Sequence, residues 1–171
     1  MVKGYLNCYK LINHFIYCRA VMKKIVVVLL GIFLVLQASS QVKDPVSWDY
    51  KAIKRGPGVF EIVITANVPK PWHMYSQSTP KGGPIPTKVS FNKNPLIVPQ
   101  GTMKESGNME KINDKVFGIK VFYYNGKVEY SQVVRVKASV ATNLTGTVSY
   151  MVCDDQQCLP PTKKTFDLKL Q

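Results

Sequence analysis

The chain has 171 residues, and its 23 lysines and arginines outnumber 10 acidic residues to give a formal charge of +13. This length suits a single domain, with or without a targeting segment. The hydrophobic content of 46% excludes a disordered chain, the charged fraction of 19% excludes a coiled coil, and four cysteines are too few for a disulfide-dense miniprotein.

Residues 1–21 precede a second methionine, Met22, and contain two of the four cysteines, Cys8 and Cys18. They follow no recognisable pattern. We therefore expect this stretch to be an upstream segment that results from a misassigned start codon, with Met22 as the initiator.

Residues 22–40 have the layout of a secretory signal peptide. Two lysines precede an apolar run at 25–36, and Ala38 and Ser40 then supply small residues before Gln41. A membrane-spanning helix needs about 20 apolar residues, so this run is too short to cross a bilayer comfortably. We predict export, cleavage before Gln41, and a mature chain without an integral membrane segment.

The remaining residues, 41–171, are predicted to form one domain. The first 40 residues hold five of the 23 basic residues and none of the acidic ones, so the charge of the mature chain falls to +8. Two cysteines remain in its sequence, Cys153 and Cys158. The mature chain therefore carries one close pair of thiols.

Apolar residues recur at every second position along much of the mature chain, which is typical of half-buried strands. The clearest alternating stretches are 60–68, 119–123, 128–136, 148–152 and 166–170. Asn125-Gly126 lies between the second and third of them. This pair favours a type I′ hairpin turn because both central residues of that turn need a positive φ. We therefore predict that the chain reverses direction there.

Glycine, proline and asparagine separate these stretches, as at 56–58, 81–84 and 92–95. Seven to nine short strands in a domain of this size indicate an all-β fold, an immunoglobulin-like β-sandwich, and we expect a monomer. The basic residues are scattered over strand faces and turns, which disfavours a nucleic-acid partner. Examples are Lys127, Arg135, Lys137, Lys163, Lys164 and Lys169.

The most informative stretch is the one that holds both cysteines. A predicted strand ends at Cys153, four polar residues follow, and Cys158 precedes Pro160-Pro161, which stops regular strand pairing. In an oxidising compartment two thiols this close should form a disulfide. A ring of six residues stabilises a fold by only about 2 kcal/mol, whereas short rings suit thiol–disulfide exchange. A structural and a redox role both remain open at this point.

The cysteines are flanked by acidic rather than basic residues. Asp154 and Asp155 disfavour a thiolate, which points to exchange with a dedicated, activated partner; the alternative is that they merely form a solvated turn.

A copper-binding module is a second hypothesis, because Met74, Met103, Met109, Met151, His73 and the two thiols are soft ligands, although the methionines also suit ordinary packing. A secreted interaction sandwich with a structural disulfide is a third. A zinc site is disfavoured because no second Cys/His pair completes it. The sequence shows no hydrolase or kinase motif, and His73 in an aromatic strand is interpreted as a packed residue.

Three segments together resemble the N-terminal periplasmic domain of the thiol:disulfide interchange protein DsbD. The first is the run from Tyr150 through both cysteines and the double proline to Thr165. The others are Trp72-His73-Met74-Tyr75, which resembles an aromatic strand of that family, and the stretch 114–118, which resembles its cap loop. Their order matches that of the family over most of the mature chain.

This resemblance implies an immunoglobulin-like fold and a periplasmic electron carrier without cofactor or metal. Cys153 and Cys158 would be the redox pair, with Cys158 as the attacking thiol. Asp114, Val116 and Phe117 would shield the pair, and Tyr75 would pack beside it.

The donor would be a membrane thiol transporter on a separate polypeptide, and the acceptors thioredoxin-like proteins. Whether the domain acts as a protein-disulfide reductase or only as an exchange component stays open. Two departures stand out. Four residues rather than five separate the cysteines, and Val116 occupies a position where an aromatic would make a better lid, so Phe117 is expected to serve instead.

Overall fold

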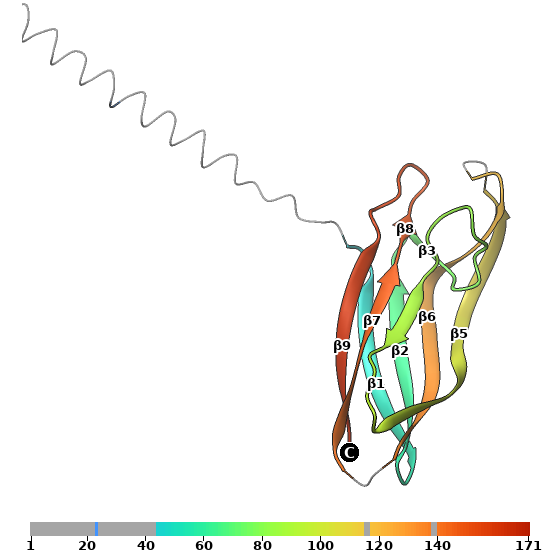
Figure 1. Ribbon diagram of the computed structural model, residues 1–171. Helices are drawn as coiled ribbons and strands as arrows, with labels where there is room; N and C mark the ends of the chain where they lie inside the picture. Colours follow the sequence, from blue (N-terminus) through green and yellow to red (C-terminus); the bar gives the residue numbers. More distant parts are fainter. Residues whose placement is uncertain (1–22, 24–43, 115–116, 138–139) are drawn as a thin grey trace, which may run out of the picture. The chain divides into compact units, whose positions relative to one another are not determined.

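The structure is a computed structural model that describes residues 23, 44–114, 117–137 and 140–171 (Figure 1). The unit Lys43–Gln171 is compact. The predicted upstream segment and signal peptide lie outside the described residues, Lys23 excepted. Within the described residues, no helix is both long and apolar enough to cross a membrane.

The described part of the unit is built from nine strands in two antiparallel sheets, so the predicted all-β sandwich of seven to nine strands is confirmed. The larger sheet has the order β1-β2-β6-β3-β8, with β5 also paired to β6, and the smaller sheet has the order β4-β7-β9. The strands are β1 Ser47–Gly56, β2 Val59–Val68, β3 His73–Tyr75, β4 Lys88–Phe91, β5 Ile97–Asn113, β6 Lys120–Val136, β7 Thr142–Tyr150, β8 Val152–Cys153 and β9 Thr162–Leu170.

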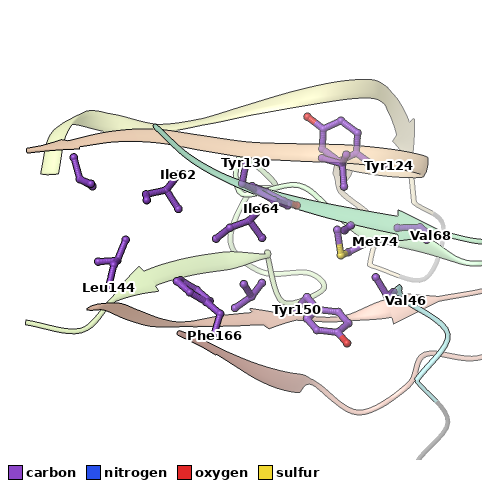
Figure 2. Close-up of a cluster of buried hydrophobic side chains, with 14 of the residues drawn as sticks. Val46, Ile62, Ile64, Val68, Met74, Tyr124, Tyr130, Leu144, Tyr150 and Phe166 are labelled. Atoms are coloured by element: carbon purple, nitrogen blue, oxygen red, sulfur yellow. The ribbon is translucent and has the colours of Figure 1, made fainter. Parts of the chain in front are cut away.

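The main core lies between the two sheets and is filled by the alternating residues of their facing strands. Along β2 the side chains of Ile62 and Ile64 are fully buried, and Leu144 and Phe166 meet them from the smaller sheet (Figure 2). Full burial of such a side chain contributes about 1.5–3 kcal/mol. The two-residue period of the sequence therefore fixes which face of each strand turns inward.

The predicted hairpin at Asn125-Gly126 is wrong. The chain does not reverse there: β6 runs through the pair, and β5 accompanies it on both sides of an irregularity between Gly107 and Met109. Gly126 does adopt a positive φ of 75°, but it does so in a bulge. At this bulge β6 changes partner, from β2, whose pairing ends at Val68, to β3.

The chain reverses instead between the end of β5 and the start of β6, where Asn113 pairs with Lys120. This reversal is closed by the Asp114 amide, which donates to the Ile119 carbonyl at 2.9 Å, and by the Gly118 amide, which donates to the Asp114 carbonyl at 2.9 Å. On the N-terminal side of the bulge, β3 pairs with β6, and β8 pairs with β3. Figure 1 shows this end of the sandwich opposite the end that carries the C terminus.

Candidate functional site

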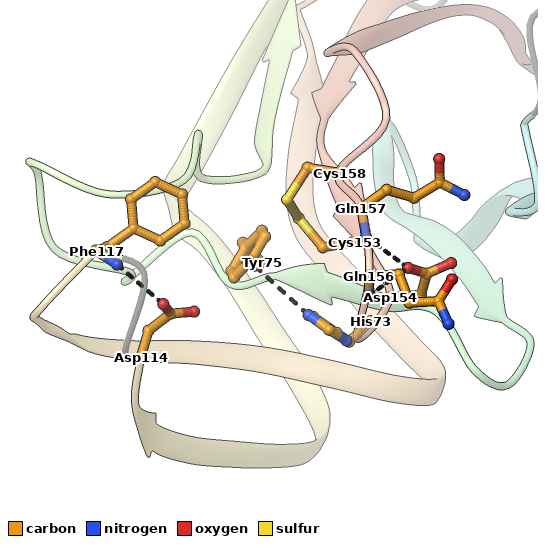
Figure 3. Close-up of a disulfide and its surroundings, with 9 residues drawn as sticks. All are labelled: His73, Tyr75, Asp114, Phe117, Cys153, Asp154, Gln156, Gln157 and Cys158. Carbon is orange, nitrogen blue, oxygen red and sulfur yellow. Dashed lines mark hydrogen bonds between the residues drawn. A yellow bond between two sulfur atoms is a disulfide. The ribbon is translucent and has the colours of Figure 1, made fainter.

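The two cysteines form a disulfide at the end of the larger sheet, with an Sγ–Sγ distance of 1.98 Å and a Cα–Cα distance of 4.0 Å (Figure 3). Cys153 ends β8 and is 2% exposed, whereas Cys158 is exposed in the connection toward β9. The pair is therefore asymmetric. One sulfur belongs to the sheet, and the other residue is open to a docking protein.

The loop between the cysteines is organised by Asp154. Its Oδ1 accepts hydrogen bonds from the backbone amides of Gln156 at 2.9 Å and Gln157 at 2.8 Å. The Asp154 amide donates to the Gln157 carbonyl at 2.9 Å, and the Leu159 amide donates to the Val152 carbonyl at 2.9 Å. Asp154 thus forms an Asx turn inside the ring closed by the disulfide. This agrees with the alternative that the aspartates after Cys153 form a turn.

Strand β3 supplies the nearest aromatic neighbours of the disulfide. In the antiparallel pairing of β3 and β8, His73 lies directly opposite Cys153, and Met74 lies opposite Val152. Residues two apart on a strand share a face, so Tyr75 points to the same side as His73. Met74 and Val152 point the other way, into the main core.

A second, smaller cluster covers the sheet face that carries Cys153. Its buried members are Tyr75, Val121 and Cys153. Three partly buried side chains pack against it: Ile119, Tyr123 and Met151. Tyr75 thus shares this cluster with Cys153, while Val121, Ile119, Tyr123 and Met151 were not assigned from the sequence.

The backbone and hydroxyl of Tyr75 are both constrained. Its carbonyl accepts hydrogen bonds from the amide of Thr87 at 3.2 Å and from the Thr87 hydroxyl at 2.6 Å. Burial, together with the nearby Asp114 and Tyr123, raises the pKa of Tyr75 to about 12. The phenol therefore stays protonated at neutral pH.

Two of the predicted cap residues, Asp114 and Phe117, lie between β5 and β6. The Phe117 amide donates to Asp114 Oδ1 at 3.0 Å, so the carboxylate shapes the hairpin tip. Val116 lies outside the described residues. In the view of Figure 3 Tyr75 lies between Phe117 and the disulfide, and Ile119 is the residue of this hairpin that packs against the cluster containing Cys153.

Acidic groups surround His73, although the chain as a whole is basic. Burial lowers the pKa of His73 below its usual 6.5, and this effect outweighs Asp155, Asp114, Asp154 and Glu110, whose negative charges raise it. The imidazole is therefore neutral at pH 7.

The proposed copper ligands occupy different surroundings. Met74 lies in the main core and Met103 packs against it, Met109 is 37% exposed, and Met151 packs near Cys153. Among the described residues, no group of three or more His, Cys, Asp and Glu side chains gathers closely enough to hold a metal ion.

Comparison with protein families gives a match over residues 42–170 to the family described as thiol:disulfide interchange protein DsbD, N-terminal. The chain belongs to this family. The region that matches the DsbD N-terminal family contains both Cys153 and Cys158. A comparison with curated proteins gives no match.

Solved structures are also similar to the chain. The N-terminal periplasmic domain of ScsB from Proteus mirabilis has a TM-score of 0.55 at 17% identity, over 76% of this chain and 48% of that one. The chain thus spans about half the length of that structure. The reduced DsbD N-terminal domain from Neisseria meningitidis has a TM-score of 0.46 at 16% identity, over 70% of this chain and 82% of that one. The immunoglobulin-like fold predicted from the sequence is confirmed.

Proposed function

We propose that this domain carries electrons through Cys153 and Cys158 in the periplasm, from a membrane thiol transporter to thioredoxin-fold proteins. Membership of the DsbD N-terminal family supports thiol:disulfide interchange as the chemistry. The observation that carries the proposal is the asymmetry of the disulfide, in which Cys158 is exposed and Cys153 is buried in the sheet. Export by the signal peptide at 22–40, with cleavage before Gln41, is part of the proposal.

In the reduced domain the Cys158 thiolate attacks a disulfide of the acceptor. A bond forms between Cys158 Sγ and one acceptor sulfur, and the other acceptor sulfur leaves as a thiolate. Cys153 then attacks Cys158 Sγ, the bond between Cys158 and the acceptor breaks, and the acceptor sulfur of that bond leaves with the electron pair while the domain becomes oxidised. Two electrons pass from the domain to the acceptor, and the two thiol protons end on the acceptor sulfurs.

The exposure of Cys158 also directs the return reaction. A thiolate of the donor attacks Cys158 Sγ because Cys153 is covered by the strand β3 and by the hairpin between β5 and β6. Asp114, Val116 and Phe117 serve as the shield that a docking partner displaces, with Tyr75 as its inner layer. The shield thus keeps Cys153 covered until a partner docks, and exchange begins at the exposed Cys158.

The test is to trap the mixed disulfide. The Cys153→Ala variant leaves Cys158 without its resolving thiol, so incubation with an oxidised thioredoxin-fold protein should accumulate a covalent 1:1 adduct on a non-reducing gel. The matched control, Cys158→Ala, leaves the buried thiol alone and should form far less adduct. Equal adduct yields from the two variants, or none from either, contradict the proposal.

A further inference from the structure

His73 lies opposite Cys153 in the pairing of β3 with β8, at the edge of the larger sheet. The two residues are paired directly in the register of β3 and β8. Side chains of directly opposed residues in an antiparallel pair lie on one face, with Cβ atoms about 4.5–5.5 Å apart. This register places the His73 side chain beside that of Cys153, and Figure 3 shows the two labelled residues as neighbours.

The imidazole is held by aromatic neighbours on the same face. Its Nε2 lies 3.5 Å from the hydroxyl of Tyr75, and its ring centroid lies 4.6 Å from that of Tyr123. The Tyr123 hydroxyl donates to Glu110 at 3.0 Å, and the side-chain amide of Asn125 donates to the other oxygen of Glu110 at 2.9 Å. The bulge at Asn125 therefore anchors the chain of contacts that orients His73.

The surroundings of His73 keep its ring neutral and able to accept a proton. Burial keeps the ring unprotonated at pH 7, and four carboxylates lie close enough to stabilise the imidazolium once it forms. They are Glu110 on β5, Asp114 directly after β5, and Asp154 and Asp155 on the loop after β8. Tyr75 and Tyr123 are the other titratable groups on this face, and burial raises the pKa of both phenols. They therefore cannot serve as bases near neutral pH.

The carboxylates themselves are less suitable bases. Asp154 accepts two backbone amides, Asp114 accepts the Phe117 amide, and Glu110 accepts from Tyr123 and Asn125. Asp155 is exposed, and a carboxylate is a weaker base than an imidazole. Among the described groups around Cys153, His73 thus has the basicity and the position that proton removal requires.

We infer that His73 is the proton acceptor that activates Cys153 for the step that resolves the mixed disulfide. This inference rests on the proposed function. With Cys158 joined to a partner sulfur, the Cys153 thiol gives its proton to the unprotonated nitrogen of His73. Its sulfur then attacks Cys158 Sγ, the bond between Cys158 and the partner breaks, and the partner sulfur leaves with the electron pair. The leaving sulfur takes up a proton, from the imidazolium or from water, which restores the neutral ring.

The size of the effect follows from thiol ionisation. A thiol with an ordinary pKa of about 8.5 is about 3% thiolate at pH 7, so a base can accelerate the attack by up to about 30-fold. We expect about ten-fold, because transfer to a base of lower pKa than the thiol is incomplete.

The experiment follows the two steps separately in the reduced full chain, with oxidised glutathione as the probe. Acid quenching and mass spectrometry measure the formation of the glutathione adduct on Cys158 and its decay to the internal disulfide. The His73→Gln variant should form the adduct at the wild-type rate and resolve it about ten-fold more slowly at pH 7. Near pH 10 the two resolution rates should converge, because Cys153 then ionises without help.

Two further variants separate proton transfer from packing. His73→Phe keeps an aromatic ring between Tyr75 and Tyr123 and should show the same slow resolution as the glutamine variant. Asp155→Asn keeps the imidazole and removes one carboxylate that raises its pKa, so the inflection of the resolution rate against pH should move to lower pH.

Equal resolution rates for wild type and both His73 variants across this pH range overturn the inference while leaving the proposed function intact. A wild-type chain that forms no adduct and no internal disulfide contradicts the proposed function and the inference together. A slowing by the same factor at every pH, pH 10 included, identifies a packing role and also overturns the inference.

Discussion

The Asx turn of Asp154 should tune the reduction potential of the disulfide. Its carboxylate accepts two backbone hydrogen bonds at 2.9 and 2.8 Å within the six-residue ring. A turn that holds the two ends of the ring together raises the effective concentration of one thiol beside the other. The disulfide must stabilise the turn by the same free energy, because the two equilibria are linked. The Asp154→Ala variant should therefore have a less negative potential than the wild type.

The magnitude follows from the two hydrogen bonds. Both lie at the surface, so we assign each about 0.7 kcal/mol, near the low end of the usual range. Their sum of about 1.4 kcal/mol corresponds to about 30 mV for a two-electron couple, or a ten-fold change in the exchange constant with glutathione. This is an upper limit, reached when the turn forms only in the oxidised domain.

The assay is equilibration with glutathione redox buffers, followed by alkylation and mass spectrometry. Two variants serve as matched controls. Asp154→Asn removes the charge but keeps an oxygen that can accept both amides, and Asp155→Ala removes a neighbouring charge that makes no hydrogen bond to the ring amides. Both should stay close to the wild-type potential. An alanine variant at 154 that matches its asparagine counterpart, or an equal shift from Asp155→Ala, refutes the role of the turn.

Two further predictions concern stability. A Cβ at Gly146 would lie 2.6 Å from the Ser90 carbonyl oxygen and 2.3 Å from Phe166 Cζ, so Gly146→Ala should lower the free energy of unfolding, measured in urea, by about 1–3 kcal/mol. The control is Gly56→Ala, which should cost far less because nothing lies within 4 Å of a Cβ there. Equal losses from the two variants would contradict this packing. Because folding lowers the pKa of His73 below its unfolded value near 6.5, the stability that this neutral residue contributes is present above pH 6.5 and is lost as the pH falls through the folded pKa. Urea melts at pH 7.5 and pH 5 should therefore show a larger loss in the wild type than in His73→Phe, and an identical loss would refute this assignment.

The sequence predicts the buried faces of the fold better than its pairings. Ile62 and Ile64 alternate with more polar neighbours, and both are fully buried as the pattern requires. The long strand β5 shows no such alternation because it lies at the sheet edge with most of its side chains exposed. Its existence depends on pairing with β6, which no local pattern encodes.

Asn125-Gly126 shows the same limit. The pair signals a local need for positive φ, and a bulge satisfies that need as well as a hairpin turn does. The choice between them depends on long-range partners, here the change from β2 to β3 along β6. The reversal occurs instead between Asn113 and Lys120, in the stretch whose resemblance to a cap loop was recognised from sequence.

The parts of the site that depend on the spacing of residues in the sequence could be predicted, whereas those that depend on the pairing register of β3 and β8 could not. Cys153 and Cys158 are close in sequence, so their bridge follows from the chain itself. His73 and Cys153 are 80 positions apart, and only the register of two short strands brings them together. The period-two rule did hold one unused clue, since it places His73 on the face of Tyr75.

The central claim is that the disulfide takes part in thiol–disulfide exchange and is not a purely structural bond. Its most direct test is the midpoint reduction potential of the Cys153–Cys158 pair in the wild-type chain, measured against glutathione at pH 7. We predict a value above about −300 mV, in the range where thioredoxin-fold partners can reduce or oxidise the pair. A value well below about −300 mV would mark a structural bond and contradict the proposed function.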